Sequence, residues 1–279
     1  MTNRPDEAAF SQVAWRDRLL AAYRRRGWRG FLSLHRLLKP PAGRPELRTI
    51  SRYGSQFSLV PGDEIDRHVL VEGFYESEVF EAVRPFLAPQ SVLWVVGANF
   101  GLHAITAKLL HPAAQVVAFE PSPAMGARIL ENCKINGLTI DLHSYALSDR
   151  TGVSPFFSKT SGNPGMSTLH PTNPADYDRK FHVGIRTAAE IIEHGAVPAP
   201  TALIVDAEGA EIDIFRGFRA HLAAPSLRAV VFEAPNDFLA TRLPRELDAL
   251  LRAAGFSFKI LPRKEDTAHA LSNFVALRS

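Results

Sequence analysis

The chain has 279 residues, of which 46% are hydrophobic and 22% are charged, and these fractions exclude disordered and fibrous classes of protein. Its length is enough for one sizeable core and a modest extra segment. The net charge of +3 conceals an asymmetry, because residues 1–50 carry 11 Lys and Arg against 4 Asp and Glu and leave the rest of the chain slightly acidic.

Residues 1–45 are predicted to form a basic helical extension. Apolar residues recur at helical spacing between residues 11 and 38, and a run of arginines at 24–26 lies among them. Such a helix either packs on the rest of the chain or rests on an anionic membrane surface or an acidic partner. The prolines of KPPAG at 39–43 end the helix, so we place a domain boundary there.

The sequence shows neither a secretory leader nor an apolar run approaching 18 residues. Its single cysteine, Cys133, cannot form an intrachain disulfide, which fits a reducing compartment. We therefore expect a cytoplasmic protein, with peripheral contact to the inner face of a membrane only through residues 11–38.

Residues 46–279 are predicted to form one α/β domain. A small hairpin is expected at 46–60, followed by a helix whose apolar face includes Val79, Phe80 and Val83. From residue 91 onward, strands and helices alternate. The expected strands are 92–97, 115–120, 140–147, 202–207, 228–234, 256–261 and 273–278, and the expected helices are 102–111, 122–136, 187–194, 208–223 and 242–254.

Several of these strands are near-continuous apolar runs, which is typical of strands covered by helices on both faces. The pattern predicts a doubly wound, Rossmann-like sheet of seven mostly parallel strands. The last two strands leave too little room for a crossover helix and are expected to pair antiparallel. The segment 148–186 lacks a helical or strand pattern, and loops of this length are usually functional or disordered. We expect this segment to be an insertion that covers the substrate.

The strongest local motif is VVGANFG at the end of the first core strand. Gly97 and Gly101 flank a tight turn into a helix, where free backbone N–H groups can meet a carboxylate or phosphate. A dinucleotide fingerprint requires glycine at two positions that are occupied here by Asn99 and Leu102. The motif therefore predicts a nucleotide-type ligand without a pyrophosphate cradle.

Two acidic motifs follow at the ends of later strands. Glu120 ends the second strand, before Pro121, at the place where a carboxylate can accept both hydroxyls of a ribose. The run LIVDAEGAE ends the fourth strand with Asp206, Glu208 and Glu211. Three carboxylates in six residues repel one another unless they face a cation, a proton or a donor-rich substrate, although Glu211 can equally favour the start of the next helix.

These motifs, with several others, resemble in order and spacing those of the FkbM-type methyltransferase family. The segments that carry the resemblance are GFYESEVF, VVGANFG, VVAFEPSP, LENCKINGL, YALSDRTG, GMSTL, VGIRT and VDAEGAEIDIFRGF. The resemblance implies the class I methyltransferase variant of the fold and S-adenosylmethionine as the cofactor. It also implies O-methylation of a hydroxyl on a sugar, glycan or secondary metabolite.

The resemblance also assigns residues to parts of the cofactor. The methionine part would lie against the turn after the first strand, the ribose against the acid after the second, the adenine against the third, and the methyl group near the fourth. The corresponding residues are Gly97, Ala98, Asn99 and Gly101, then Glu120 with Pro121, then Ala146 and Leu147, and finally Asp206, while Tyr75 and Glu76 are expected to close over the cofactor.

Two positions depart from the family pattern. The family usually has an aspartate at the position of Val96, where it helps to anchor the cofactor's amino group, and a lysine at the position of Ile204. Loss of the aspartate is expected to weaken cofactor binding unless Glu76 or Asp206 compensates. A weakly active or inactive relic that serves as an interaction protein therefore stays open as an alternative.

Methyl transfer to a hydroxyl requires positioning and removal of the acceptor proton. The candidates for the base are Asp206, Glu208, Glu233 and His103, with His182 as a further histidine, although a lone histidine is more often structural. A second alternative for Asp206 and Glu233 is that they hold a divalent cation such as Mg²⁺. The sequence leaves the need for a metal open.

The rival function is methylation of nucleic acid, and three features disfavour it. The fourth strand is followed by DAEG rather than by Asn-Pro-Pro and an aromatic residue, and Cys133 lacks the Pro-Cys setting of cytosine methyltransferases. The acidic balance beyond residue 50 repels a phosphate backbone. We expect a small-molecule, sugar or glycan acceptor and no nucleic acid, and the sequence predicts no particular oligomeric state.

Overall fold

The computed structural model describes residues 47–60, 62–159, 164–235, 242–262 and 271–278. The chain divides into two compact units, and the boundary lies between Tyr75 and Glu76. The predicted extension at 1–45, with its basic helix at 11–38, lies outside the described residues, so its membrane contact stays a prediction.

The first unit contains the predicted hairpin. Strand β1 (Leu47–Ile50) pairs antiparallel with β2 (Gln56–Leu59), and the turn between them uses Gly54 at a φ of 89°. Helix α3 (Glu64–Glu72) follows and ends at Gly73, which adopts the left-handed conformation that glycine tolerates. The hairpin prediction is confirmed.

The second unit is built on a seven-stranded sheet with the order β11-β12-β10-β9-β3-β4-β5. Five strands are parallel, whereas β12 pairs antiparallel with both β10 and β11. This is the predicted doubly wound sheet of mostly parallel strands, and the predicted antiparallel pairing of the last two strands is confirmed. The strands are β3 (Val92–Val96), β4 (Gln115–Phe119), β5 (Asp141–His143), β9 (Ala202–Val205), β10 (Ala229–Pro235), β11 (Phe256–Ile260) and β12 (Leu271–Arg278).

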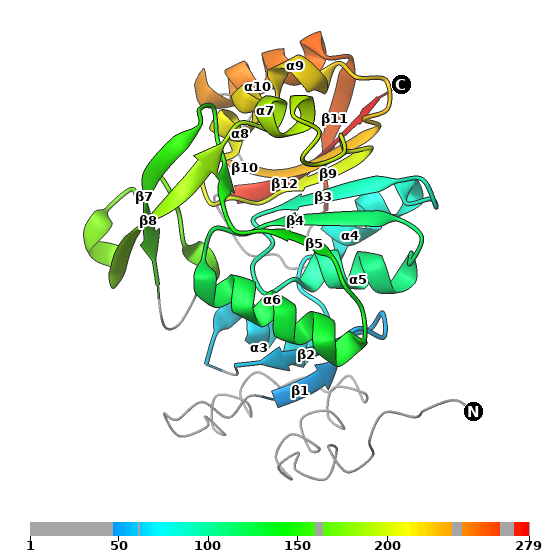
Figure 1. Ribbon diagram of the computed structural model, residues 1–279, viewed down its shortest axis with the longest axis vertical. Coiled ribbons are helices and arrows are strands. Elements are labelled where there is room, and N and C mark those ends of the chain that lie inside the picture. The colour runs from blue at the N-terminus through cyan, green and yellow to red at the C-terminus, as the bar shows by residue number, and fades with distance from the viewer. Residues whose placement is uncertain (1–46, 61, 160–163, 236–241, 263–270, 279) are drawn as a thin grey trace. The chain divides into compact units, whose positions relative to one another are not determined.

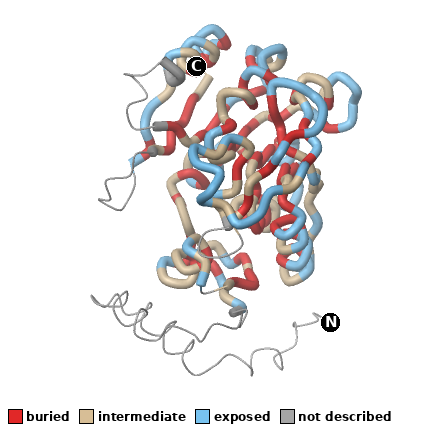
Figure 2. Tube along the Cα trace, turned by 90° about the vertical axis from the view of Figure 1, so that its left-hand side faces the viewer, coloured by how far each residue is buried: buried red, intermediate tan, exposed pale blue. Residues whose placement is uncertain are grey.

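Helices cover both faces of this sheet (Figure 1). The lower face in Figure 1 carries α4 (Ser77–Val83), extended by the short η2 (Arg84–Phe86), together with α5 (Leu102–Leu110) and α6 (Pro123–Asn136). The upper face carries α7 (Ala188–Glu193), α8 (Glu211–Gly217), α9 (Arg219–Leu222) and α10 (Arg242–Ala253). Buried positions run along the strands between these layers, and exposed positions lie outside them (Figure 2). The apolar strand runs therefore form the core.

The predicted strand at 140–147 is divided between two sheets. Its first part is β5 at the edge of the large sheet, and its second part is β6 (Ala146–Leu147) in a separate three-stranded sheet with the order β6-β8-β7. The other two strands of that sheet are β7 (Gly152–Ser158) and β8 (Arg179–Arg186). The two strands are joined through η3 (Pro164–Met166) and η4 (Pro174–Asp176).

The expectation that 148–186 lacks regular structure is therefore wrong. Every second residue of β7 from Ser154 onward is buried, but two of the three are Ser154 and Ser158, so hydrophobicity does not reveal the alternation. Gly217 of α8 allows this sheet to come close, because a Cβ there would lie 2.0 Å from the carbonyl oxygen of Ser148. The role of 148–186 in covering a substrate stays a prediction.

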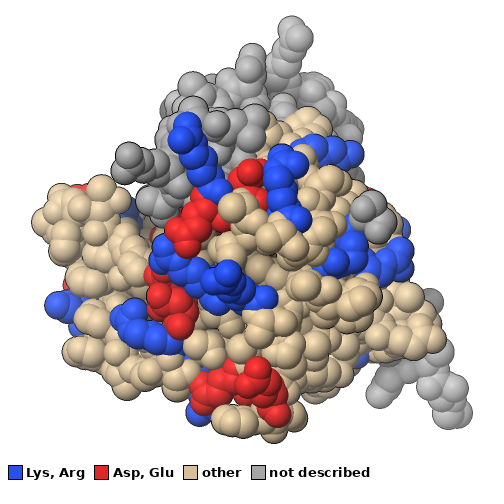
Figure 3. Space-filling view, turned by 90° about the horizontal axis from the view of Figure 1, so that it is seen from above, with Lys and Arg blue, Asp and Glu red and all other residues tan. Residues whose placement is uncertain are grey.

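Charges of both signs are interspersed on the face that lies uppermost in Figure 1 (Figure 3). Arg216 pairs with Glu246 at 2.7 Å, and Arg252 pairs with Asp248 at 2.6 Å. This part of the surface therefore presents no single-sign field of the kind that a phosphate backbone requires. Among the described helices, none has both the length and the apolar character needed to cross a membrane.

Candidate functional site

The predicted site lies at the carboxyl ends of the parallel strands, where ligands bind in open α/β sheets. The described residues other than glycine that have positive φ are Glu76, Asn99 and Glu208, with values of 48°, 52° and 51°. Asn99 follows β3, Glu208 follows β9, and Glu76 immediately precedes α4. Left-handed backbone at such residues is strained and gathers at functional sites, so these three loops are candidates for ligand contact.

Gly97 lies where β3 and β9 come into close contact beyond their last paired residues. Its φ is 78°, and a Cβ at this position would lie 1.7 Å from the carbonyl oxygen of Asp206. The N–H of Asp206 also donates to the carbonyl of Val96 at 3.0 Å. The glycine is therefore required by the contact between two backbones, and this contact fixes Asp206 beside the turn.

The turn after β3 is fixed to the end of β4 by hydrogen bonds. The N–H groups of Gly97 and Ala98 donate to the carbonyl of Phe119 at 3.0 and 3.1 Å. The N–H of Asn99 donates to Oε2 of Glu120 at 2.8 Å. The turn is thus held in one conformation by its neighbouring strand.

Glu120 is buried, and its carboxylate satisfies two backbone donors. Besides Asn99, the N–H of Ser122 donates to its Oε1 at 2.8 Å. Removal from water raises the pKa of Glu120 to about 7, while the two N–H groups act in the opposite direction. A carboxylate has about four acceptor positions, so two remain for a ligand. That Glu120 and Pro121 lie against a ribose stays a prediction.

Five carboxyl groups, which we call the acidic cluster, act on one another from the start of α4, the loop after β9 with the start of α8, and the second half of β10. Removal from water raises the pKa of Asp206 well above its ordinary value, and the charges of Glu233 and Glu76 add to this effect. The pKa of Glu208 rises to about 8 for the same reason and through the charge of Glu233, with Lys159 acting in the opposite direction. The cluster consists of Glu76, Asp206, Glu208, Glu211 and Glu233.

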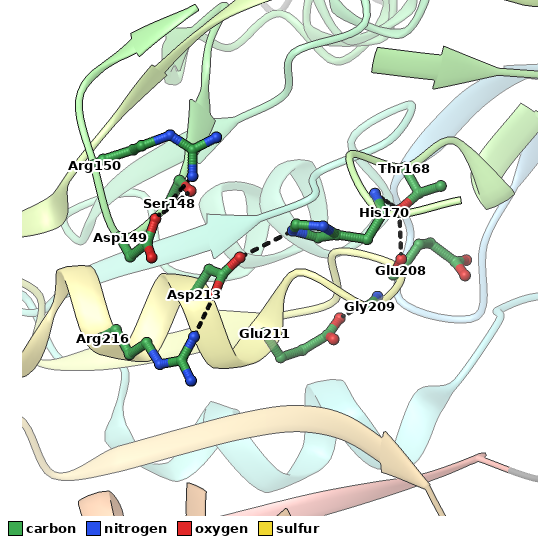
Figure 4. A network of polar contacts seen from close by, with 10 residues as sticks. All are labelled: Ser148, Asp149, Arg150, Thr168, His170, Glu208, Gly209, Glu211, Asp213 and Arg216. Atoms are coloured by element: carbon green, nitrogen blue, oxygen red, sulfur yellow. Dashed lines mark hydrogen bonds and ion pairs between the residues drawn. The ribbon is translucent and has the colours of Figure 1, made fainter. Parts of the chain in front are cut away.

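Glu211 has a local structural task within this cluster. Its Oε1 accepts hydrogen bonds from the N–H groups of Ala207 and Gly209 at 2.9 and 3.3 Å. Figure 4 shows its carboxylate turned back toward Gly209, whereas the side chain of Glu208 extends away from α8. The structure therefore favours the interpretation that Glu211 stabilises the start of α8.

The raised pKa of Glu208 predicts how stability depends on pH. Between its ordinary pKa of 4.5 and its folded value of about 8, the folded chain holds more protons than the unfolded chain, so the free energy of unfolding falls as pH rises through this range. Replacing Glu208 with Gln is expected to make this decrease shallower in urea denaturation between pH 5 and pH 8.5. Exposed Glu131 on α6 supplies the matched control, Glu131→Gln. Equal slopes for Glu208→Gln and the parent protein would contradict the prediction.

Thr168 fixes the loop that carries Glu208. Its hydroxyl donates to the carbonyl of Glu208 at 2.7 Å and accepts from the N–H of His170 at 2.9 Å (Figure 4). Because Thr168 is buried, Thr168→Val is expected to cost about 1–3 kcal/mol of stability and to lower kcat. Thermal unfolding and steady-state kinetics would measure both, and Thr168→Ser should restore them. Failure of serine to restore kcat would show that the methyl group, rather than the hydroxyl, matters.

The remaining predicted residues differ in burial and lie in different parts of the structure. His103 lies in the first turn of α5, and removal from water lowers its pKa to about 4, which makes it a weak base. His182 is exposed on β8. Ala146 and Leu147 are buried in β6, where their place beside an adenine stays a prediction. The same holds for Tyr75, which ends the first unit with its ring 5.5 Å from that of His68.

The two departures from the family pattern are buried apolar residues. Val96 ends β3, Ile204 lies in β9, and each is 2% exposed. The charges of Glu76 and Asp206 act on one another, so carboxylates that can replace a missing aspartate are present near the end of β3. Within the part of the chain that is described, no group of three or more His, Cys, Asp or Glu side chains is arranged to hold a metal ion.

Asn273 is a candidate site residue that the sequence pattern does not reveal. It lies directly across from Glu233 in the antiparallel pair β10–β12, so both side chains are on the same face of the sheet. It is 2% exposed, and its Nδ2 has no hydrogen-bond partner among the described residues. A buried donor without an acceptor is rare and suggests a ligand group or a water.

The unpaired Nδ2 group of Asn273 leads to a prediction about both stability and function. Asn273→Leu is expected to raise the free energy of unfolding by about 1 kcal/mol, because it removes a buried unsatisfied donor. It is also expected to lower kcat without changing the affinity of the site for its nucleotide-type ligand. Urea denaturation, calorimetry and kinetics would separate these effects. Unchanged kcat together with raised stability would show that Asn273 has no task at the site.

The chain is similar in sequence to proteins of one known family. The sequence profile of the methyltransferase FkbM domain matches residues 96–258. Hexuronic acid methyltransferase AglP of Haloferax volcanii is 29% identical over 225 residues, which cover 80% of this chain and 87% of that protein. The 31-O-demethyl-FK506 methyltransferase FkbM of Streptomyces tacrolimicus is 37% identical over 198 residues, which cover 61% of this chain and 74% of that protein.

Two solved structures align at low identity. The precorrin-6y C5,15-methyltransferase of Geobacter metallireducens is 16% identical with a TM-score of 0.45, over 73% of this chain and 87% of that chain. The tRNA (uracil-54, C5)-methyltransferase of Pyrococcus abyssi is 12% identical with a TM-score of 0.48, over 84% of this chain and 44% of that chain.

Proposed function

This chain belongs to the FkbM methyltransferase family, and from that premise we propose that it is an O-methyltransferase that acts on a hydroxyl of a sugar, glycan or secondary metabolite. Family membership makes methyl transfer its reaction class and S-adenosylmethionine its cofactor. The acidic cluster is the observation that carries the proposal.

The residues at the sheet edge fit this cofactor. S-adenosylmethionine supplies an electrophilic methyl group on a positively charged sulfonium and also carries an ammonium group. Around Asp206, the neighbouring groups that raise its pKa are carboxylates, so a cationic ligand relieves their repulsion. Glu120 would hold the ribose with its two remaining acceptor positions, and the turn at Gly97 would hold the methionine part.

The base that removes the acceptor proton is assigned to the acidic cluster. A base works best when its pKa is near the working pH, and the pKa of Glu208 at about 8 meets this condition better than that of His103 at about 4. Asp206 is placed beside the turn by its contact with Gly97, so it would orient the reacting groups. The charge of Glu233 acts on both Asp206 and Glu208, and it would keep the pKa of Glu208 high enough for this residue to accept a proton.

The acceptor class is supported by the relatives. One relative is named for methylating a hexuronic acid and another for methylating FK506 lacking its 31-O-methyl group. Both names describe small molecules, and the latter specifies an oxygen as the acceptor atom. A hydroxyl on a sugar or related metabolite is therefore the proposed acceptor of this chain.

Calorimetry with S-adenosylmethionine, followed by transfer of its labelled methyl group to a panel of sugars, glycans and polyketides, tests the proposal. We expect micromolar binding that releases protons, because a cation lowers the raised pKa values of the acidic cluster. Glu208→Gln should lower kcat with little change in cofactor affinity. Cofactor binding without transfer to any acceptor would support the relic alternative, and transfer to RNA or DNA alone would support the nucleic-acid alternative.

A further inference from the structure

Four side chains of the three-stranded sheet and its connection form a continuous series, which we call the aromatic-lysine cluster. Nζ of Lys180 lies 5.2 Å from the ring centroid of Phe157, and that ring lies 6.0 Å from the ring of Tyr177. Nζ of Lys159 lies 5.6 Å from the ring centroid of Tyr177. All four residues are at least partly exposed, so together they form a surface with two flat rings and two ammonium groups.

The aromatic-lysine cluster adjoins the acidic cluster through Glu208. The pKa of the Tyr177 hydroxyl is raised by removal from water and by the charge of Glu208, and Lys159 acts on Glu208 in turn. Backbone bonds fix this arrangement, because Phe157 exchanges hydrogen bonds of 2.9 and 2.8 Å with Thr168. Thr168 also donates to the carbonyl of Glu208. The surface is thus held beside the proposed base.

The two ammonium groups are available to a ligand. Within the described residues of the three-stranded sheet, its connection and α7, the ion pairs are those of Arg150 with Asp149, His170 with Asp213, Arg186 with Glu190 and Glu193 with His221, and none involves Lys159 or Lys180. A lysine ammonium is a compact charge that pairs readily with a carboxylate or a phosphate. Two lysines beside acidic side chains do not make the extended positive field that a nucleic acid requires, so a small anion is favoured.

We propose that the aromatic-lysine cluster binds the methyl acceptor and selects one that carries a carboxylate or a phosphate group next to a ring. The inference rests on the proposed function. The rings of Phe157 and Tyr177 offer flat apolar surfaces for the ring of the acceptor. The charges then orient it, since its hydroxyl points to Glu208 and its anionic group points to Lys180.

Binding of three matched probes tests this selectivity without the need for turnover. The probes are p-nitrophenyl β-D-glucoside, p-nitrophenyl β-D-glucuronide and p-nitrophenyl β-D-glucoside 6-phosphate, which share a ring and an aglycone and differ in charge. Ligand-observed NMR on the full chain at low salt should show that at least one anionic probe binds about tenfold more tightly than the neutral probe. The preference should shrink as salt is added. Comparison of the two anionic probes identifies carboxylate or phosphate as the favoured group.

The double variant Lys159→Met with Lys180→Met should abolish the preference, because methionine keeps the length of the side chain and removes its charge. Lys259→Met on β11 is the matched control, since Lys259 is exposed on an edge strand of the large sheet and not in the three-stranded sheet. This control should keep the preference of the parent protein.

Equal binding of neutral and anionic probes, or a preference that survives in the double variant, would overturn the inference. Calorimetry with S-adenosylmethionine on the same samples tests the proposed function separately. Normal cofactor binding without charge selection removes the acceptor inference and leaves the methyltransferase. Charge selection without cofactor binding removes the proposed function and leaves an anion-binding surface.

Discussion

Glu120→Ala is expected to lower the affinity for S-adenosylmethionine about 100-fold, because it removes two charge-assisted hydrogen bonds to the ribose. It should also lower the free energy of unfolding by about 2 kcal/mol or more, since the N–H groups of Asn99 and Ser122 lose their acceptor in a buried site. Calorimetry on folded protein measures the first effect, and urea denaturation measures the second.

Two further variants separate binding from stability at this position. Glu120→Gln keeps the volume and one acceptor oxygen, so it should fall between the parent protein and the alanine variant in both measurements. Glu131→Ala on α6 removes an exposed carboxylate and should change neither. Unchanged cofactor affinity in folded Glu120→Ala would limit Glu120 to holding the turn, and the ribose contact would then be wrong.

Gly97→Ala is expected to have the largest effect on stability, a loss of at least about 3 kcal/mol, from a steric clash added to left-handed backbone strain. The added Cβ would lie 1.7 Å from the carbonyl oxygen of Asp206, so the ends of β3 and β9 must separate. Urea denaturation measures the loss. Cofactor binding should fall with it, because the turn and Asp206 move apart.

Gly137→Ala isolates the contribution of the clash. Gly137 ends α6 at a φ of 62°, and a Cβ there would have no atom within 4 Å. This variant should therefore lose only about 1–2 kcal/mol, which is the cost of left-handed backbone. Similar losses in the two variants would show that β3 and β9 separate readily and that the close contact does not fix the site.

Much of the fold could be predicted from the sequence, because each buried strand of the large sheet carries its own signal. The runs at 92–96 and 202–205 are apolar throughout, as expected when helices cover both faces. The short connection between the last two strands indicated their antiparallel pairing. Sequence patterns were less informative at 140–147, where one predicted strand serves two sheets, because hydrophobicity records burial and does not identify the partner strand.

The candidate site was predicted in outline for a related reason. Carboxyl ends of parallel strands meet at one edge, so Glu120 and Asp206 could be placed together once the strands were recognised. The contacts of Glu120 with two backbone N–H groups could not be predicted, because they depend on how the turn after β3 folds over β4. The place of Asn273 at the site could not be predicted, because a single polar residue in a mostly apolar strand gives no periodic pattern.

The order along the chain of the strands and helices of the large sheet, the turn at Gly97 and the acids that follow β4 and β9 could all be predicted from local sequence patterns. These features depend on neighbours along the chain, where spacing and residue type act directly. Three features became visible only in the folded chain: Asn273 faces Glu233, the backbone of Asp206 excludes a side chain at Gly97, and an aromatic and basic surface adjoins Glu208. Each of these contacts joins residues that are far apart in the chain. They depend on how the sheets and helices pack together, and no local sequence pattern predicts them.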